Sequence, residues 1–218
     1  MEAPFGRRKR PRARKFASGL RVPDALDVEM LDTQMEMTSA LMFAVEWKEH
    51  QLHVVSHCAR VSLTATWLAQ QAGIAGDTFH DLQYAARMHE VGMIAVPTEL
   101  LRKPGPLTAE ELERIRSQAR IGAEVARTMR RPLAGVIIEN QYTDYEALRR
   151  RFAAGSTEFL LTGILRVADV FDALTTPRPY QRPVPESRGL EILRAGAGTK
   201  FHPDAVQTLL RGWSASAS

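Results

Sequence analysis

Cysteine is nearly missing from this chain, since Cys58 is the only one in 218 residues. A single cysteine forms no disulfide framework within the chain, and such scarcity is typical of proteins that work in a reducing compartment. No apolar run approaches the about 18 residues that a membrane span needs. No apolar stretch follows the basic residues near the start either, so the sequence predicts no secretory signal. We therefore expect a cytoplasmic protein in which Cys58 serves core packing.

Excess basic charge is missing from most of the chain, although the net charge is +4. Residues 1–16 contain one acid and seven basic side chains: Arg7, Arg8, Lys9, Arg10, Arg12, Arg14 and Lys15. Without them, the totals of 29 basic and 25 acidic residues fall to 22 and 24. The composition of the remainder is therefore not that of a basic nucleic-acid binder.

Residues 1–22 are predicted to form a disordered arm, because like charges repel and Pro4, Pro11 and Gly19 interrupt any helix. The interpretation that we favour for this arm is a solubilising tail. The alternative is contact between its basic side chains and an anionic lipid, RNA or an acidic partner surface.

The hydrophobic spacing is helical along the chain, and no segment of useful length has the period of a strand. The sequence therefore predicts an all-α protein. Residues 23–48 are expected to be a helical extension, with a methionine-rich surface that suits core packing or, alternatively, a homodimer interface. Residues 49–212 are expected to be one helical domain, and residues 213–218 a frayed tail. We predict helices at 49–73, 77–91, 108–130, 133–152, 157–175, 186–195 and 203–212, with a short extended piece at 93–97.

Local signals support several of these helix ends. Gly73 is a good C-terminal stop, and Thr108 with Glu111 has the spacing of a capping box. Asp77 or Thr78 is expected to cap the second helix.

A set of potential metal ligands is spread over three of the predicted helices. His89 and Glu90 are adjacent near a helix end, His57 lies 32 residues before His89, and Asp169 lies 79 residues after Glu90. Two imidazoles and two carboxylates suit a hard or borderline divalent metal. His53 shares one helix face with His57. The alternative is a pair of buried histidines bonded to backbone or carboxylate groups, without a metal.

Beyond these residues, the chain from His57 to about Leu210 resembles an HD-GYP domain, a branch of the HD superfamily of metal-dependent phosphohydrolases. The resemblance rests on the order and spacing of HCARVSLTATWLAQQAG, LQYAARMHEVGMIAVPTELLRKPGPLTAEELERI, ARIGAEV, ILRVADVFDALTTPRPY and RAGAGTKFHPDAV. It implies a helical bundle with HD-GYP-type C-terminal helices. It also implies bacterial cyclic di-GMP signalling, because family members with intact sites hydrolyse that messenger with two or three metals, commonly iron or manganese.

The sequence matches the family ligand positions only in part. His57, His89 and Asp169 match, while Glu90 stands where the family has Asp. His53 replaces a family Glu, Gln118 replaces a family His, and Glu139-Asn140 replace two paired histidines. Met93 stands in place of a lysine, and the Gly-Tyr-Pro signature is absent. His53 and Glu139 are candidates for additional ligands.

These departures lead us to expect a degenerate site that is catalytically weak or inactive, with His89 and Glu90 as vestiges of catalysis. Such a protein would act by binding cyclic di-GMP or other proteins of its signalling. The alternative is a working phosphodiesterase with a rearranged, reduced metal site. The sequence leaves two possibilities for the metal. One iron or manganese binds at His57, His89, Glu90 and Asp169, or no metal binds. A third hypothesis is a nucleic-acid-binding regulator that uses the basic residues of the arm.

Overall fold

A computed structural model describes residues 37–42, 44–45, 54–177 and 182–216. The chain divides into two units, residues 1–39 and 40–218. Of the first unit only residues 37–39 are described, and they are helical. The predictions for the arm and for most of residues 23–48 therefore lie outside the described residues, and so does His53.

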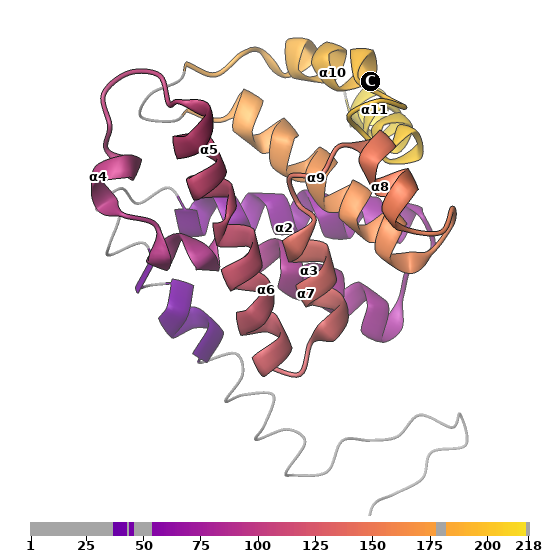
Figure 1. Ribbon diagram of the computed structural model, residues 1–218. Helices are drawn as coiled ribbons and strands as arrows, with labels where there is room; N and C mark the ends of the chain where they lie inside the picture. Colours follow the sequence, from indigo (N-terminus) through magenta and orange to yellow (C-terminus); the bar gives the residue numbers. More distant parts are fainter. Residues whose placement is uncertain (1–36, 43, 46–53, 178–181, 217–218) are drawn as a thin grey trace, which may run out of the picture. The chain divides into compact units, whose positions relative to one another are not determined.

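Helices make up the regular structure of the second unit (Figure 1). They are α2 (Val54–Gln71), α3 (Gly76–Met88), the 3₁₀ helix η1 (Val91–Ala95), α4 (Thr98–Leu101), α5 (Ala109–Arg116), α6 (Gln118–Thr128), α7 (Pro132–Glu139), α8 (Tyr145–Arg151), α9 (Thr157–Thr175), α10 (Glu186–Ala195) and α11 (Pro203–Ser216). Within the described ranges the only β pairing is an isolated bridge between Ala197 and Phe201. The all-α prediction is confirmed. No helix among the described residues is both long and apolar enough to cross a membrane.

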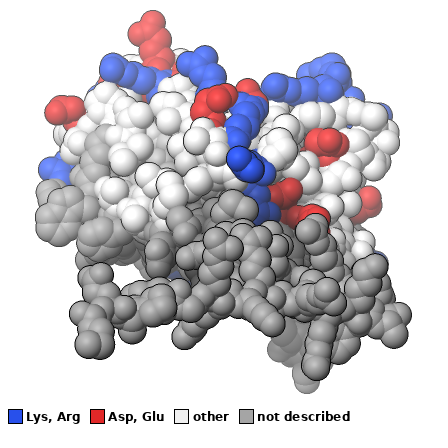
Figure 2. Space-filling model, turned by 90° about the horizontal axis from the view of Figure 1, so that it is seen from below, with Lys and Arg blue, Asp and Glu red and all other residues white. Residues whose placement is uncertain are grey.

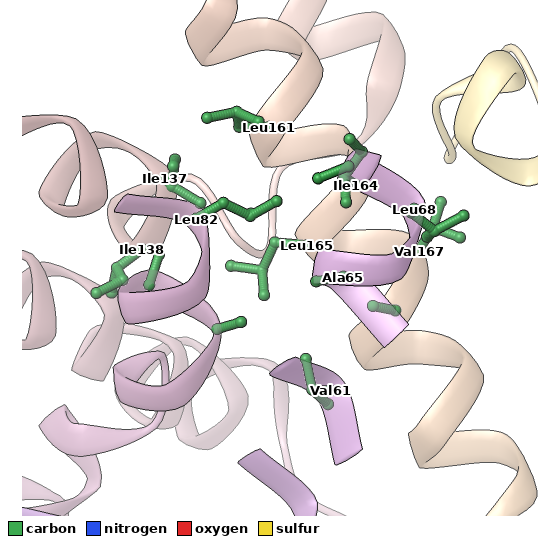
Figure 3. Close-up of a cluster of buried hydrophobic side chains, with 14 of the residues drawn as sticks. Val61, Ala65, Leu68, Leu82, Ile137, Ile138, Leu161, Ile164, Leu165 and Val167 are labelled. Atoms are coloured by element: carbon green, nitrogen blue, oxygen red, sulfur yellow. The ribbon is translucent and has the colours of Figure 1, made fainter. Parts of the chain in front are cut away.

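The core lies where α2, α3, α7 and α9 meet, and Figure 3 shows their apolar side chains pointing toward one another. The labelled members are Val61, Ala65, Leu68, Leu82, Ile137, Ile138, Leu161, Ile164, Leu165 and Val167. Each of them has 1% or less of its surface exposed to solvent. Burying a side chain of leucine or isoleucine size contributes about 2 kcal/mol. The helices that carry the predicted ligands are thus held together by this cluster.

Charged side chains of both signs are mixed on the surface that Figure 2 shows. On the described part of that face, Lys and Arg lie beside Asp and Glu, and neither sign forms a patch of its own. This agrees with the near balance of charge that the sequence gives for residues 17–218.

Several predicted helix ends are confirmed. Gly73, two residues after α2, has a φ of 74°, a conformation that glycine adopts without strain. The capping box of α5 is present, because the Thr108 side chain accepts from the Glu111 backbone and the Glu111 carboxylate accepts from the Thr108 N–H. The predicted cap of α3 was wrong, since Ala75 stands at that position and no side chain caps the helix.

Other boundaries differ from the predictions. Residues 91–95 form the 3₁₀ helix η1 rather than an extended piece. Two predicted long helices are each divided, at Ser117 between α5 and α6 and at residues 140–144 between α7 and α8. After the second break, the first N–H groups of α8 donate to the carbonyls of Lys200 and Thr199, which provide the partners that a continuous helix would have supplied. Helix α11 runs on to Ser216, into the predicted tail.

Candidate metal centre

The predicted ligands His57, His89, Glu90 and Asp169 meet in one place. His57 lies on α2, His89 and Glu90 follow directly after α3, and Asp169 lies on α9. These three helices pack against one another and cross in the middle of Figure 1. Both histidines are buried, while the two carboxylate side chains keep 15% and 16% of their surface exposed. The centre is therefore internal, and its carboxylates are the part that keeps contact with solvent.

The distances between donor atoms suit a common ion. Nε2 of His57 lies 3.2 Å from Oδ1 of Asp169 and 3.8 Å from Oε1 of Glu90. Nε2 of His89 lies 3.8 Å from the same Asp169 oxygen. Nitrogen and oxygen ligands of one divalent metal stand roughly 3 to 3.5 Å apart, because each lies about 2.1 Å from the ion. Donor atoms of His57, His89 and Asp169 all lie within 4.8 Å of one another.

His89 gives the strongest indication that this group of residues fits a metal. Its Nδ1 lies 2.8 Å from the carbonyl oxygen of Ala86, which can accept only if Nδ1 carries the ring proton. Nε2 then presents a lone pair toward Asp169, and among the described residues it has no hydrogen-bond partner. A buried nitrogen without a partner is costly unless something binds it. A divalent cation would satisfy this lone pair and both nearby carboxylates.

His57 is held from both sides by carboxylates. Its Nδ1 lies 2.6 Å from Oδ2 of Asp172, and Arg60 donates to the same carboxylate from Nε at 2.5 Å and Nη2 at 3.0 Å. Burial lowers the pKa of His57, but hydrogen bonds to Asp169 and Asp172 outweigh it and raise the pKa to about 9. Without a metal, His57 is therefore an imidazolium at neutral pH, and metal binding would displace its proton.

Asp172 and Arg60 were missed in the sequence. Burial raises the pKa of Asp172, but the stronger combined effect of His57 and Arg60 lowers it to about 2. Each of the two residues lies three positions after a predicted ligand, Arg60 after His57 and Asp172 after Asp169. That spacing places both pairs on single helix faces and was the available signal.

Cys58 lies beneath the centre. Its sulfur is 3.7 Å from Nδ1 of His89, and the side chain belongs to the buried core, as predicted. Burial raises the pKa of the thiol well above its ordinary value, so the sulfur stays protonated at neutral pH.

Neutral amides occupy the side of the centre formed by α6 and α7. Gln118 is completely buried, and its Nε2 donates to the carbonyl of His89 at 3.0 Å and to the hydroxyl of Tyr142 at 2.9 Å. Gln141 donates to the same His89 carbonyl at 2.8 Å. Asn140 donates back to Val136 within its own helix. These side chains use their donors on backbone and phenol oxygens.

Gly92 allows this amide layer to come close. A Cβ at this position would lie 2.0 Å from the backbone oxygen of Gln118 and 2.8 Å from its side-chain oxygen. Gly92 is therefore required for the contact between η1 and the start of α6.

The remaining candidates lie elsewhere. Glu139 forms an ion pair with Arg127. Two groups of potential metal ligands occur in the described part of the chain, His57 with His89 and Asp169, and Cys58 with His89 and Glu90, and Glu139 belongs to neither. Met93 is partly buried against the core. His53 lies outside the described residues.

Comparison with known proteins gives a consistent family. A family model described as "HD domain" matches residues 47–205. Among curated proteins, a cyclic di-GMP phosphodiesterase of Thermotoga maritima is 28% identical over 84% of this chain and 50% of its own length. The cyclic di-GMP phosphodiesterase response regulator RpfG of Xanthomonas campestris is 31% identical over 84% of this chain and 49% of its own. A 3'3'-cGAMP-specific phosphodiesterase 2 of Vibrio cholerae is 31% identical over 86% of this chain and 36% of its own.

One solved structure gives the same fold. Bd1817, described as an HDG"Y"P protein from Bdellovibrio bacteriovorus, aligns with a TM-score of 0.56 at 18% identity, over 74% of this chain and 52% of that one. This confirms the predicted helical bundle. The chain spans about half or less of the length of these relatives.

Proposed function

We propose, on the premise that this chain belongs to the HD domain family, that it is a metal-dependent phosphodiesterase that hydrolyses cyclic di-GMP at a reduced, single-metal centre. The ligands would be His57, His89, Glu90 and Asp169, and the metal iron or manganese. The observation that carries the proposal is the buried Nε2 of His89, which points at a carboxylate and has no hydrogen-bond partner among the described residues. The names of the relatives support the reaction class.

The chain's own residues prepare the centre before a metal arrives. The Ala86 carbonyl fixes the proton of His89 on Nδ1, and Asp172 does the same for His57. Both Nε2 atoms thereby face the carboxylates. Such preparation lowers the reorganisation that binding requires. A divalent metal supplies Lewis-acid stabilisation of phosphoryl charge and lowers the pKa of water.

We now prefer hydrolysis to the loss of activity that the departures from the family pattern had led us to expect. Glu90 keeps a carboxylate at the position of the family acid, and its Oε1 lies 3.8 Å from His57. The amides at positions 118 and 140 remove nitrogen donors only on the side of α6 and α7. The set on α2, α3 and α9 is sufficient for one ion.

The test is metal content and turnover in the full chain purified without chelator. We expect about one manganese or iron per chain, and metal-dependent hydrolysis of cyclic di-GMP, with cyclic GMP-AMP assayed in parallel. His89→Ala is expected to abolish both. The matched control is His80→Ala, which removes an exposed histidine from α3 and leaves both unchanged. Equal metal content and turnover in His89→Ala and the wild type would refute the proposal.

A second candidate is the binding protein without turnover that we first favoured. It is supported by the amide layer, since Gln118 and Gln141 both donate to the His89 carbonyl, and by His57, which forms hydrogen bonds with two carboxylates without any metal. In that case calorimetry would show saturable binding of cyclic di-GMP while the nucleotide stays intact with added manganese or ferrous iron. Partner proteins, a homodimer and a cytoplasmic location stay predictions from the sequence.

A further inference from the structure

We propose that Asp172 and Arg60 are positioning residues that decide which nitrogen of His57 carries the ring proton, and so keep the Nε2 lone pair available to the metal centre. This inference rests on the proposed function, because it concerns a ligand of the same centre. It adds two residues that the sequence pattern had not assigned.

The Asp172 carboxylate is surrounded by donors. Oδ2 receives Nδ1 of His57 at 2.6 Å and Nη2 of Arg60 at 3.0 Å. Oδ1 receives Nε of Arg60 at 2.5 Å and the hydroxyl of Thr176 at 3.2 Å. The Asp172 side chain is only 7% exposed, whereas Arg60 reaches the surface with 40%. A buried carboxylate needs such a partner, and Arg60 supplies both a positive charge and a bidentate pair of hydrogen bonds.

This arrangement controls the histidine because an ionised carboxylate can only accept hydrogen bonds. Asp172 lies closer to Nδ1, at 2.6 Å, than Asp169 lies to Nε2, at 3.2 Å, so Nδ1 keeps the proton when the ring is neutral and the lone pair of Nε2 is directed toward Asp169 and Glu90. Helix α2 brings His57 and Arg60 to Asp172 from the same face, three positions apart. Arg60 therefore fixes Asp172, and Asp172 fixes His57.

The two histidine ligands differ in how they are oriented. Nδ1 of His89 meets a backbone carbonyl, that of Ala86, which no side-chain substitution removes. His57 depends instead on a side chain that a single isosteric change can convert. Asp172→Asn replaces one carboxylate oxygen by an amide NH₂.

The orientation of that amide can be derived from the contacts. Its oxygen is expected to stay with Nε of Arg60 and the hydroxyl of Thr176, both of which donate. The NH₂ group then faces Nδ1 of His57, which must become an acceptor. The ring proton moves to Nε2, and the lone pair that would bind the metal is lost.

The experiment compares wild type, Asp172→Asn and Arg60→Met in the full chain. Nitrogen-15 NMR of the imidazoles, in metal-free protein at a pH where the His57 ring is neutral, reports the tautomer. We expect the proton on Nδ1 in the wild type and on Nε2 in Asp172→Asn. Manganese titration is expected to show an affinity about 100-fold lower for Asp172→Asn and about 10-fold lower for Arg60→Met.

Asp81→Asn is the matched control, since it neutralises the acid of another partly buried pair, with Arg131, on α3. It is expected to change stability but neither the tautomer nor manganese affinity. If Asp172→Asn keeps the proton on Nδ1, or its affinity stays within about threefold, the inference fails. If Asp172→Asn does not fold, an unchanged affinity of Arg60→Met refutes it equally. A wild type that binds no manganese refutes the proposed function, while the tautomer still decides this inference.

Discussion

The two sides of the centre differ in the kind of polar group they bury. On α2, α3 and α9, imidazoles and carboxylates converge, and one imidazole nitrogen has no hydrogen-bond partner among the described residues. On α6 and α7, neutral amides donate to backbone carbonyls and to Tyr142. The first side gathers potential metal ligands, while the second gathers amides whose nitrogens are hydrogen-bonded and whose oxygens, in Gln118, Asn140 and Gln141, have no hydrogen-bond partner within the described residues. We propose that the first side binds the metal and that the second side serves packing.

Among the substitutions that test this difference between the two sides, Gly92→Ala is expected to have the largest effect on stability. The new methyl group would overlap the backbone oxygen of Gln118, so η1 and α6 must separate. We expect a loss of about 3 kcal/mol in the free energy of unfolding, measured by urea titration. Gly155→Ala is the control, because that position has a φ of 79° but open space, and about 1 kcal/mol is expected there. Equal losses would show that the close contact is not the cause.

A smaller effect is expected from Gln118→Met, which keeps the volume but removes the donor to His89 and Tyr142. Two lost hydrogen bonds predict a loss of about 2 kcal/mol in stability. Manganese affinity should stay within about threefold of the wild type, since the amide is packing rather than a ligand. Urea titration and calorimetry on the same protein separate the two. A large loss of affinity with unchanged stability would contradict the division.

The smallest effect concerns His202, a buried histidine held by rings rather than by carboxylates. It packs against Tyr145 and Phe159, and burial lowers its pKa, an effect that Asp204 offsets only in part. As the pH is lowered through the unfolded pKa of about 6.5, His202 binds a proton more readily in the unfolded chain than in the folded chain. The free energy of unfolding therefore decreases as the pH is lowered.

His202→Phe should reduce the stability difference between neutral and mildly acidic pH, because it removes a group whose pKa is lowered by burial. Urea unfolding at both pH values measures this. An unchanged acid sensitivity would mean that His202 is not the group responsible.

The sequence alone pointed to the four candidate ligands that the fold brings together, because residue type and helical spacing are local features. His57, His89, Glu90 and Asp169 are residues that bind metals, and helical spacing placed each on a buried face. It did not predict Asp172 and Arg60, because a charged residue three positions along a helix resembles an ordinary polar face. Only the packing of α2 against α9 brings the two together.

The fold was predictable for similar reasons. The bounds of α9 and α10 agree with their hydrophobic spacing. The break at Ser117 was missed, since neither glycine nor proline marks it; it comes with the buried hydrogen bonds of Gln118. The 3₁₀ turn η1 was missed because its close contact with α6 is a tertiary effect.

The most direct measurement is the number of metal ions per chain after loading with manganese and removing the excess. The account predicts one ion in the wild type and in the control Asp144→Asn, whose carboxylate pairs with Arg166. It predicts none in Asp169→Asn, because that carboxylate stands between both histidines. Two ions per wild-type chain, or one retained in Asp169→Asn, would contradict it.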